Sequence, residues 1–340
     1  MKKIIIITLA SLVGLAGIAA LVTWMMIHSY ETTPHEGSGK EMAVSIQRGA
    51  GPRAVARLLA DAGVIDEAVD FERYVHYYRR ASGRIKAGEL AFRDDMTPKQ
   101  ALNVLLAGTP VTHSITIPEG LRIDEVAELY SQAGLADKAK FVARARDKAF
   151  VKSLNLPGDC LEGFLFPDTY KFRKETPLDE ILGEMVAGYR QLFTAEWRER
   201  AREIGMSELQ VVTLASIVEK ETGTASERAL ISGVFHNRLR DNWRLDTDPT
   251  VIYAVLLARG SFSGNLTLED LKIDSPYNTY RHKGLPPGPI CNPGREAIEA
   301  ALFPEKTKHF FFVSKNDGTH FFCPTLACHY AAVRRFQGGG

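Results

Sequence analysis

The stretch SELQVVTLASIVEKETG, residues 207–223, decides what kind of domain this chain can build. Ser207 followed three residues later by Gln210 is a capping box, which marks the start of a helix. Positions 211–218 are apolar on nearly every side of that helix, so the sequence predicts that it lies in a protein interior. Gly223 predicts its end.

Glu219 stands at the end of this buried helix and shares a face with Ala215 and Ser216. An apolar wall raises the pKa of a carboxyl group, and a raised pKa keeps a proton available for general acid catalysis. Glu221 points elsewhere, and we expect it to reach solvent or bind a cation. A salt bridge from Glu219 to Arg228 is the structural alternative to catalysis.

Proline- and glycine-rich loops rich in Tyr and Asn follow this helix. Such side chains suit sugar binding by stacking and hydrogen bonding, although loops with a purely structural role remain an alternative. These segments are SPYNTY at 275–280, GLPPGPI at 284–290 and NPG at 292–294. Before them, FHNRL at 235–239 and DTDPT at 246–250 place amides and carboxylates close in sequence. Upstream, EGFLFPDTY at 162–170 predicts a further loop that faces the substrate.

Composition excludes several classes of protein. With 45% hydrophobic and 24% charged residues among 340, the chain is not disordered, and a formal net charge of +1 gives no support to nucleic-acid binding. The sequence contains no HExxH, no GxSxG and no phosphate-binding glycine loop, and its histidines lack metal-ligand spacing. We therefore expect neither a metal nor an organic cofactor.

The N-terminus predicts a membrane anchor. After Lys2 and Lys3, residues 4–27 carry no charge and are numerous enough to span a bilayer. A cleaved signal peptide is the alternative, but the apolar run is longer than such a segment needs. The two lysines place the N-terminus in the cytoplasm and the rest outside it. We expect an anchor at 1–28 in the cytoplasmic (inner) membrane and a tether at 29–41.

An internal repeat follows the tether. The pattern at 46–64 recurs at 117–135 with a constant offset of 71 residues, and each copy predicts a strand, a glycine turn, an amphipathic helix and a glycine stop. We expect the two copies to pack together with the elements between them. Those elements are helices at 71–80 and 98–106, the second capped by Thr97, and a strand at 89–92.

The remaining pattern predicts a mixture of helices and short strands, hence an α+β fold. Helices are expected at 138–154, 178–193 and 195–204, and a hairpin at 310–322 with its turn at 316–318. Four cysteines lie outside the anchor, at 160, 291, 323 and 328. An exported location permits a Cys323–Cys328 bridge, and buried free thiols are the simpler alternative.

The motifs taken together resemble the YceG-like endolytic murein transglycosylases, the MltG family. The resemblance rests on ASIVEKET at 215–222, SER at 226–228, VFHNRL at 234–239, TDPTVIY at 247–253, YNTY at 277–280, GLPPG at 284–288 and NPG at 292–294, with EGFLFPDTY upstream. It implies an N-terminal transmembrane helix, a LysM-like α/β subdomain at 42–155 and a mixed α/β catalytic domain at 156–337. One departure is Asp246, where the family leads us to expect Gln.

The same resemblance implies a function. Glu219 matches the family's catalytic glutamate, which cleaves the bond between N-acetylmuramic acid (MurNAc) and N-acetylglucosamine (GlcNAc) in nascent glycan strands of peptidoglycan. The products would end in 1,6-anhydroMurNAc, strand elongation would stop, and penicillin-binding proteins and other cell-wall synthases would be partners. The residues we expect to position Glu219 or the sugars are Ser216, Glu221, Asn237, Asp248, Tyr277 and Asn278.

Two rival functions remain. A non-catalytic peptidoglycan-binding scaffold would use the LysM-like part as its binder and would lock Glu219 to Arg228. A hydrolytic muramidase would need a second carboxylate about 5–9.5 Å from Glu219, for which Asp246 and Asp248 are the candidates.

Overall fold

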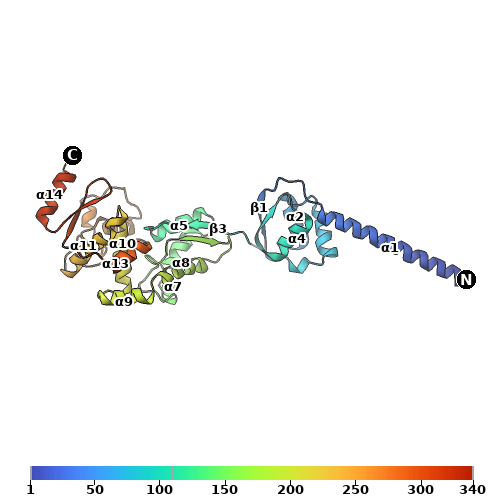
Figure 1. Cartoon of the computed structure of the whole chain (residues 1–340), viewed down its shortest axis with the longest axis horizontal. Helices are drawn as coiled ribbons and strands as arrows, with labels where there is room; N and C mark the ends of the chain where they lie inside the picture. Colours follow the sequence, from blue (N-terminus) through green and yellow to red (C-terminus); the bar gives the residue numbers. More distant parts are fainter. Residues whose placement is uncertain (1, 109, 339–340) are drawn as a thin grey trace. The chain divides into compact units, whose positions relative to one another are not determined.

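The computed structural model describes residues 2–108 and 110–338, and it confirms a mixture of helices and two-stranded sheets (Figure 1). The described residues fall into two compact units, which divide between His113 and Ser114, with Arg173–Glu175 counted in the first. The boundary predicted from the sequence, between 155 and 156, lies inside the second unit. The division into a LysM-like subdomain at 42–155 and a catalytic domain at 156–337 stays a prediction.

The first unit begins with α1, Lys2–Thr32. Its part from Thr8 to Thr32 is long and apolar enough to cross a membrane, a test that a signal sequence near an N-terminus also passes. The helix continues past the expected anchor into the residues predicted to form a tether. There Glu31 is buried, pairs with Arg79 and accepts a hydrogen bond of 3.1 Å from the Tyr74 hydroxyl. Thus Glu31, just beyond the anchor predicted at 1–28, is helical and packed.

The body of the first unit is a two-stranded antiparallel sheet covered by helices. The predicted helices at 71–80 and 98–106 and the strand at 89–92 are confirmed, with shifted ends, and Thr97 and Gln100 form a capping box. The elements are β1 (Glu41–Ile46), α2 (Pro52–Asp61), α3 (Ala68–Arg73), the π-helical turn η1 (Tyr74–Tyr78), the 3-10 turn η2 (Ser82–Arg84), β2 (Gly88–Arg93) and α4 (Pro98–Ala107).

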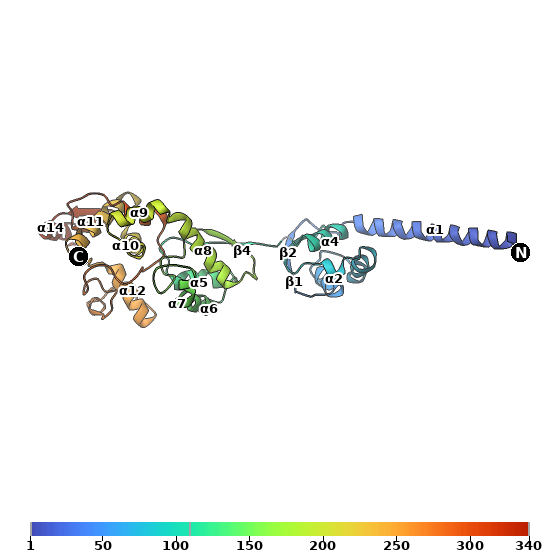
Figure 2. The same ribbon diagram turned by 90° about the horizontal axis from the view of Figure 1, so that it is seen from below.

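The second unit opens with a sheet of β3 and β4 and the helices that gather around it (Figure 2). The region predicted to be helical at 138–154 is helical but forms two helices, because Asp147 accepts a hydrogen bond of 2.9 Å from the Ala149 amide and caps the second one. The elements are β3 (His113–Thr116), α5 (Ile123–Gln132), α6 (Lys138–Ala145), α7 (Lys148–Ser153), β4 (Thr169–Phe172) and α8 (Leu178–Leu192).

Both copies of the internal repeat adopt the predicted strand, turn and helix. Gly49 and Gly120 occupy equivalent turns with φ of 80° and 77°, a region that favours glycine. The copies nevertheless do not share a core. The first belongs to the core of the first unit, whereas the second packs with α6 to α8 in the second unit. The expectation that the two copies pack together is therefore wrong.

The rest of the second unit surrounds the helix α10. The elements are α9 (Ala195–Glu203), α10 (Glu208–Glu221), the 3-10 turn η3 (Ala225–Glu227), α11 (Arg228–Arg240), α12 (Asp248–Arg259), the 3-10 turn η4 (Asp270–Lys272), α13 (Arg295–Leu302), β5 (Phe311–Ser314), β6 (His320–Cys323) and α14 (Leu326–Phe336).

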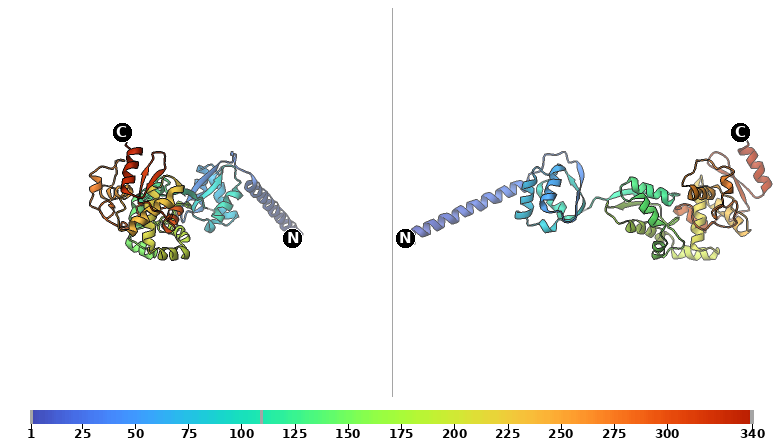
Figure 3. Two further views of the ribbon diagram at one scale, coloured as in Figure 1. Left: turned by 60° about the vertical axis from the view of Figure 1, so that its left-hand side comes forward. Right: turned by 180° about the vertical axis from the view of Figure 1, so that it is seen from behind.

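The C-terminal hairpin is confirmed, and α14 lies beside it (Figure 3). Asn316 and Gly318 take positive φ values of 63° and 83° in its turn. A disulfide joins Cys323 of β6 to Cys328 of α14, so the alternative of free thiols does not hold for this pair. Cys160 and Cys291 are free.

Candidate active site

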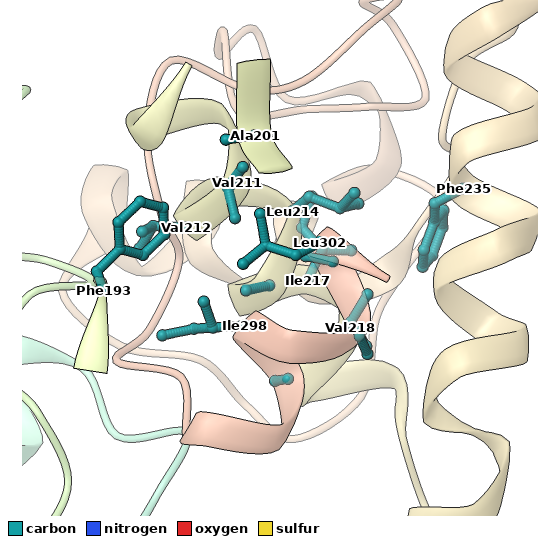
Figure 4. Packing of buried hydrophobic residues seen from close by; sticks show 14 of the residues in the cluster. Phe193, Ala201, Val211, Val212, Leu214, Ile217, Val218, Phe235, Ile298 and Leu302 are labelled. Carbon is teal, nitrogen blue, oxygen red and sulfur yellow. The ribbon is translucent and has the colours of Figure 1, made fainter. Parts of the chain in front are cut away.

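Helix α10 is the buried element predicted from the sequence. Ser207 and Gln210 form the expected capping box, and residues 211–218 are all buried. Figure 4 shows Val211, Val212, Leu214, Ile217 and Val218 of this helix packed with side chains of α11 and α13. The interior thus fixes the helix axis, and its last turn carries Glu219 out of the core.

Glu219 is half-buried at that last turn. Its Oε2 accepts a hydrogen bond of 3.2 Å from the Gly294 amide, and Arg228 pairs with Glu296. Burial raises the pKa of the Glu219 carboxyl above its ordinary value, and the negative charge of Glu119 adds to the rise. The Gly294 hydrogen bond and the charges of Arg228 and Lys220 act in the opposite direction. A raised pKa is what a general acid requires.

Glu119 is a carboxylate of this site that the sequence did not reveal. It is exposed, and it lies so close to Gly294 that a Cβ at that position would overlap its carboxylate. A Cβ added at Gly120 would lie 3.5 Å from Cγ of Glu219. The turn of the second repeat copy therefore borders Glu219 directly.

Asn292 joins the segments around Glu219. Its side chain is fully buried, and its Oδ1 accepts hydrogen bonds of 2.9 Å from Gly163 and 3.0 Å from Leu165. Its Nδ2 donates to the Leu121 carbonyl at 2.8 Å and to Oε1 of Glu162 at 3.4 Å. One amide thus connects the loop that carries Glu119, the segment at 161–165 and the segment that leads to Gly294.

Glu162 lies in the core, so the first part of the segment 162–170 does not face substrate as predicted, whereas residues 166–169 are half-buried or exposed. It is 1% exposed, and its carboxylate accepts hydrogen bonds from the Ile123 amide at 3.0 Å and the Tyr253 hydroxyl at 3.1 Å. Burial raises the pKa of Glu162 from 4.5 to about 7, against those hydrogen bonds. Residues 161–165 are all buried, and their side chains pack in the interior of the second unit.

Ser216 lies near the site, in a supporting position. Its hydroxyl donates to the Thr213 carbonyl at 2.7 Å and accepts from the Ile290 amide at 3.0 Å. The Cys291 thiol donates to its carbonyl at 3.4 Å. Ser216 therefore fixes the chain just before Asn292.

Glu221 is half-buried. Its carboxylate accepts a hydrogen bond from the Thr247 hydroxyl, and burial raises its pKa, with the charge of Asp248 adding to the rise. A contact of Glu221 with a cation or with the sugars stays a prediction. Asp248 accepts a hydrogen bond of 2.7 Å from the Tyr280 hydroxyl. These two carboxylates anchor the start of α12 to neighbouring loops.

Asn237 and Asn278 support loops. The Asn237 amide donates to the carbonyls of Thr307 at 3.0 Å and His309 at 2.9 Å. The Asn278 amide donates to two carbonyls of the η4 region, those of Leu271 at 2.9 Å and Ile273 at 3.0 Å. Both side chains are buried and hold nearby backbone in place, and their role in positioning Glu219 or the sugars stays a prediction.

Tyr277 packs against another aromatic ring, whereas Asp246 lies beside an arginine. The half-buried Tyr277 ring lies 4.9 Å from that of Tyr253, and burial raises the pKa of Tyr277 to about 12. Asp246 has a left-handed backbone with φ of 44°, and its carboxylate lies 3.2 Å from Arg244. A role for Tyr277 in sugar stacking stays a prediction.

Two cavities lie on elements that neighbour the site, and Glu219 lines neither of them. One cavity of about 260 Å³ is lined in part by Arg228 and Glu296, and one of about 440 Å³ in part by Arg122, Glu125 and Tyr253. Within residues 2–108 and 110–338, no group of three or more His, Cys, Asp and Glu side chains is arranged to hold a metal ion.

Sequence reasoning missed Glu119, Glu162, Asn292 and Gly294 as parts of the site. The repeat did mark the turn that holds Glu119, and NPG was noted as irregular backbone. Neither pattern shows that the two segments pair, because their contacts join residues far apart in the sequence.

Comparison with known proteins agrees with this geometry. The sequence profile of the YceG-like family matches residues 44–335. The chain belongs to the YceG-like family. A crystal structure of a YceG-like protein from Listeria monocytogenes superposes with a TM-score of 0.59 at 33% identity, covering 87% of this chain and 100% of that one.

Two curated relatives carry a functional name. The endolytic murein transglycosylase of Bacillus subtilis strain 168 is 32% identical over 309 residues, which cover 86% of this chain and 84% of the relative. The protein of the same name from Streptococcus pneumoniae D39 is 30% identical over 310 residues, which cover 82% of this chain and 55% of that relative.

The buried carboxyl of Glu162 predicts a pH dependence of stability. Folded chains keep its proton up to about pH 7, whereas unfolded chains lose it near pH 4.5, so the folded state binds more protons between these values. The free energy of unfolding should therefore fall as the pH rises through this window, by on the order of 3 kcal/mol from this group. Glu162→Gln mimics the protonated form and should flatten the dependence in denaturant titrations. Glu269→Gln, at an exposed position, is the control and should leave the pH dependence of the free energy of unfolding as in wild type. An unchanged pH dependence in Glu162→Gln would count against this account.

The buried amide of Asn292 predicts a large effect on stability. Asn292→Leu keeps the number and branching of the side-chain heavy atoms but leaves the amides of Gly163 and Leu165 without their acceptor, so the free energy of unfolding should fall by about 3 kcal/mol or more. Denaturant unfolding measures this loss. Asn265→Leu, at an exposed position, should change it by less than about 0.5 kcal/mol. A loss in Asn292→Leu as small as that of this control would show that the amide does not hold the site together.

Proposed function

We propose that this chain is an endolytic peptidoglycan lytic transglycosylase in which Glu219 is the catalytic acid and base. The observation that carries the proposal is the state of Glu219, which is half-buried at the end of an apolar helix and bonded to the Gly294 amide. Its pKa is raised by burial. The names of the curated relatives support the same function.

The proposed reaction needs one carboxyl group in two roles. Glu219 protonates the glycosidic oxygen between MurNAc and GlcNAc, and the bond to the muramoyl C1 breaks. The C6 hydroxyl of the same MurNAc then attacks C1 while Glu219 takes back the proton from that hydroxyl. The product is a 1,6-anhydroMurNAc end, no water is consumed, and Glu219 is returned to its starting state.

A scaffold without activity is less well supported. In that function Glu219 would be a structural ion-pair partner of Arg228. Arg228 instead pairs with Glu296, and its charge lowers the pKa of Glu219 less than burial raises it. The carboxyl of Glu219 thus remains available for chemistry.

A hydrolytic muramidase is the second candidate, and one observation favours it. Hydrolases that use two carboxylates place a second one near the acid, and Glu119 lies against the glycine that binds Glu219. Asp246 and Asp248, the candidates from the sequence, contact Arg244 and Tyr280. Glu119 is therefore the first residue to examine if the products are hydrolytic.

The setting of the enzyme is also a proposal. We place α1 across the cytoplasmic membrane, with Lys2 and Lys3 on the cytoplasmic side and the catalytic domain, 156–337, outside. Region 42–155 would be LysM-like, a proposal with which the pairing of β1 and β2 under covering helices is compatible. In this position the enzyme would cut nascent strands beside penicillin-binding proteins and other synthases and so end their elongation.

Digestion of purified glycan strands tests the proposed reaction. The full-length protein in detergent should yield internal fragments whose 1,6-anhydro ends are about 18 Da lighter than hydrolysed ends in mass spectrometry. Glu219→Gln should abolish them, because it removes the proton donor. Glu269→Gln, at an exposed position, is the matched control and should leave cleavage intact.

The products also separate the alternatives. Reducing ends in place of anhydro ends would establish the hydrolase. Binding without cleavage, unchanged by Glu219→Gln, would establish the scaffold and refute the proposal.

A further inference from the structure

The loop between β3 and α5 is fixed against the end of α10. The backbone N–H of Gly120 donates to the backbone carbonyl of Asn292 at 2.8 Å, and the backbone N–H of Asn292 donates to the Leu121 carbonyl at 2.8 Å. From α10, Nζ of Lys220 donates to the Gly120 carbonyl at 3.4 Å. The loop is therefore held on both sides, and the residue before Gly120 has a defined place beside Glu219.

That residue is Glu119. Its side chain is exposed, yet it occupies the space where any side chain at Gly294 would have to lie. Gly294 is also the residue whose amide donates to Glu219 at 3.2 Å. Two carboxylates, one half-buried and one exposed, thus meet at a single glycine at the start of α13.

We propose that Glu119 is a second functional carboxylate of the Glu219 site and acts through Glu219 as its negatively charged neighbour. The inference rests on the proposed function, since it concerns the acid of that reaction. Glu119 is exposed to water. Its charge opposes the loss of the proton from Glu219, and this keeps more of the enzyme in the form that can protonate the glycosidic oxygen.

Two cations face Glu219 and act against Glu119. Arg228 at the start of α11 is paired with Glu296, and Lys220 on α10 is bonded to the Gly120 carbonyl. The buried thiol of Cys291 is also close, but burial keeps its pKa well above the ordinary value, so it stays uncharged. Without Glu119, burial would remain to oppose the two cations, but the negative charge beside Glu219 would be lost.

The pH profile of cleavage tests the inference. In Glu119→Gln the side chain keeps its size and loses its charge, so Glu219 should lose its proton at a lower pH. The alkaline limb of kcat/KM should move down by about one pH unit, and cleavage at pH 7 should fall about tenfold. Glu119→Asp keeps the charge and should hold the limb close to its wild-type position.

The possible results are distinct. A uniform loss of activity in Glu119→Gln at every pH, with the limb in its wild-type position, would mean a structural role and overturn the inference. A shifted limb in both Glu119→Gln and Glu119→Asp would also overturn it, because charge would then not be the cause. A wild-type protein that cuts no glycan, or cuts equally well as Glu219→Gln, would refute the proposed function itself and the inference with it.

Discussion

The site depends on the hydrogen bonds of one buried amide. Asn292 connects the turn that carries Glu119, the segment that carries Glu162 and the chain that leads to Gly294. A buried amide must satisfy its hydrogen bonds, so these three segments adopt one arrangement or lose several bonds together. Because Gly294 binds Glu219 and adjoins Glu119, the packing around Asn292 fixes the environment in which Glu219 ionises.

Helix α10 supplies the other half of that environment. Its buried residues fix where the helix ends, and Glu219 is the first residue of its last turn that is not fully buried. Burial makes the charged form of Glu219 unfavourable, and the Gly294 amide partly compensates. The raised pKa of Glu219 is therefore due mainly to its burial in the fold, and the charge of Glu119 on a neighbouring loop raises it further.

Features that depend on local chemistry were predictable from the sequence. The capping box at Ser207, the apolar run of α10 and the position of Glu219 follow from spacing alone, and the structure confirms their geometry. The helical region predicted at 138–154 is confirmed, but the pattern did not show that the side-chain cap at Asp147 divides it into two helices. Asn237 and Asn278 were expected to position Glu219 or the sugars, and polarity in a sequence does not reveal the backbone carbonyls to which their amides donate.

The most direct test of this account is the titration of Glu219 itself. Carbon-13 NMR of side-chain carboxyls in labelled glutamate, compared between wild type and Glu219→Gln, identifies its resonance and gives its pKa. The account predicts a value above about 4.3, the ordinary value of glutamate. A value at or below it would contradict the account, because Glu219 would then be an ordinary ionised carboxylate and not an acid prepared by burial.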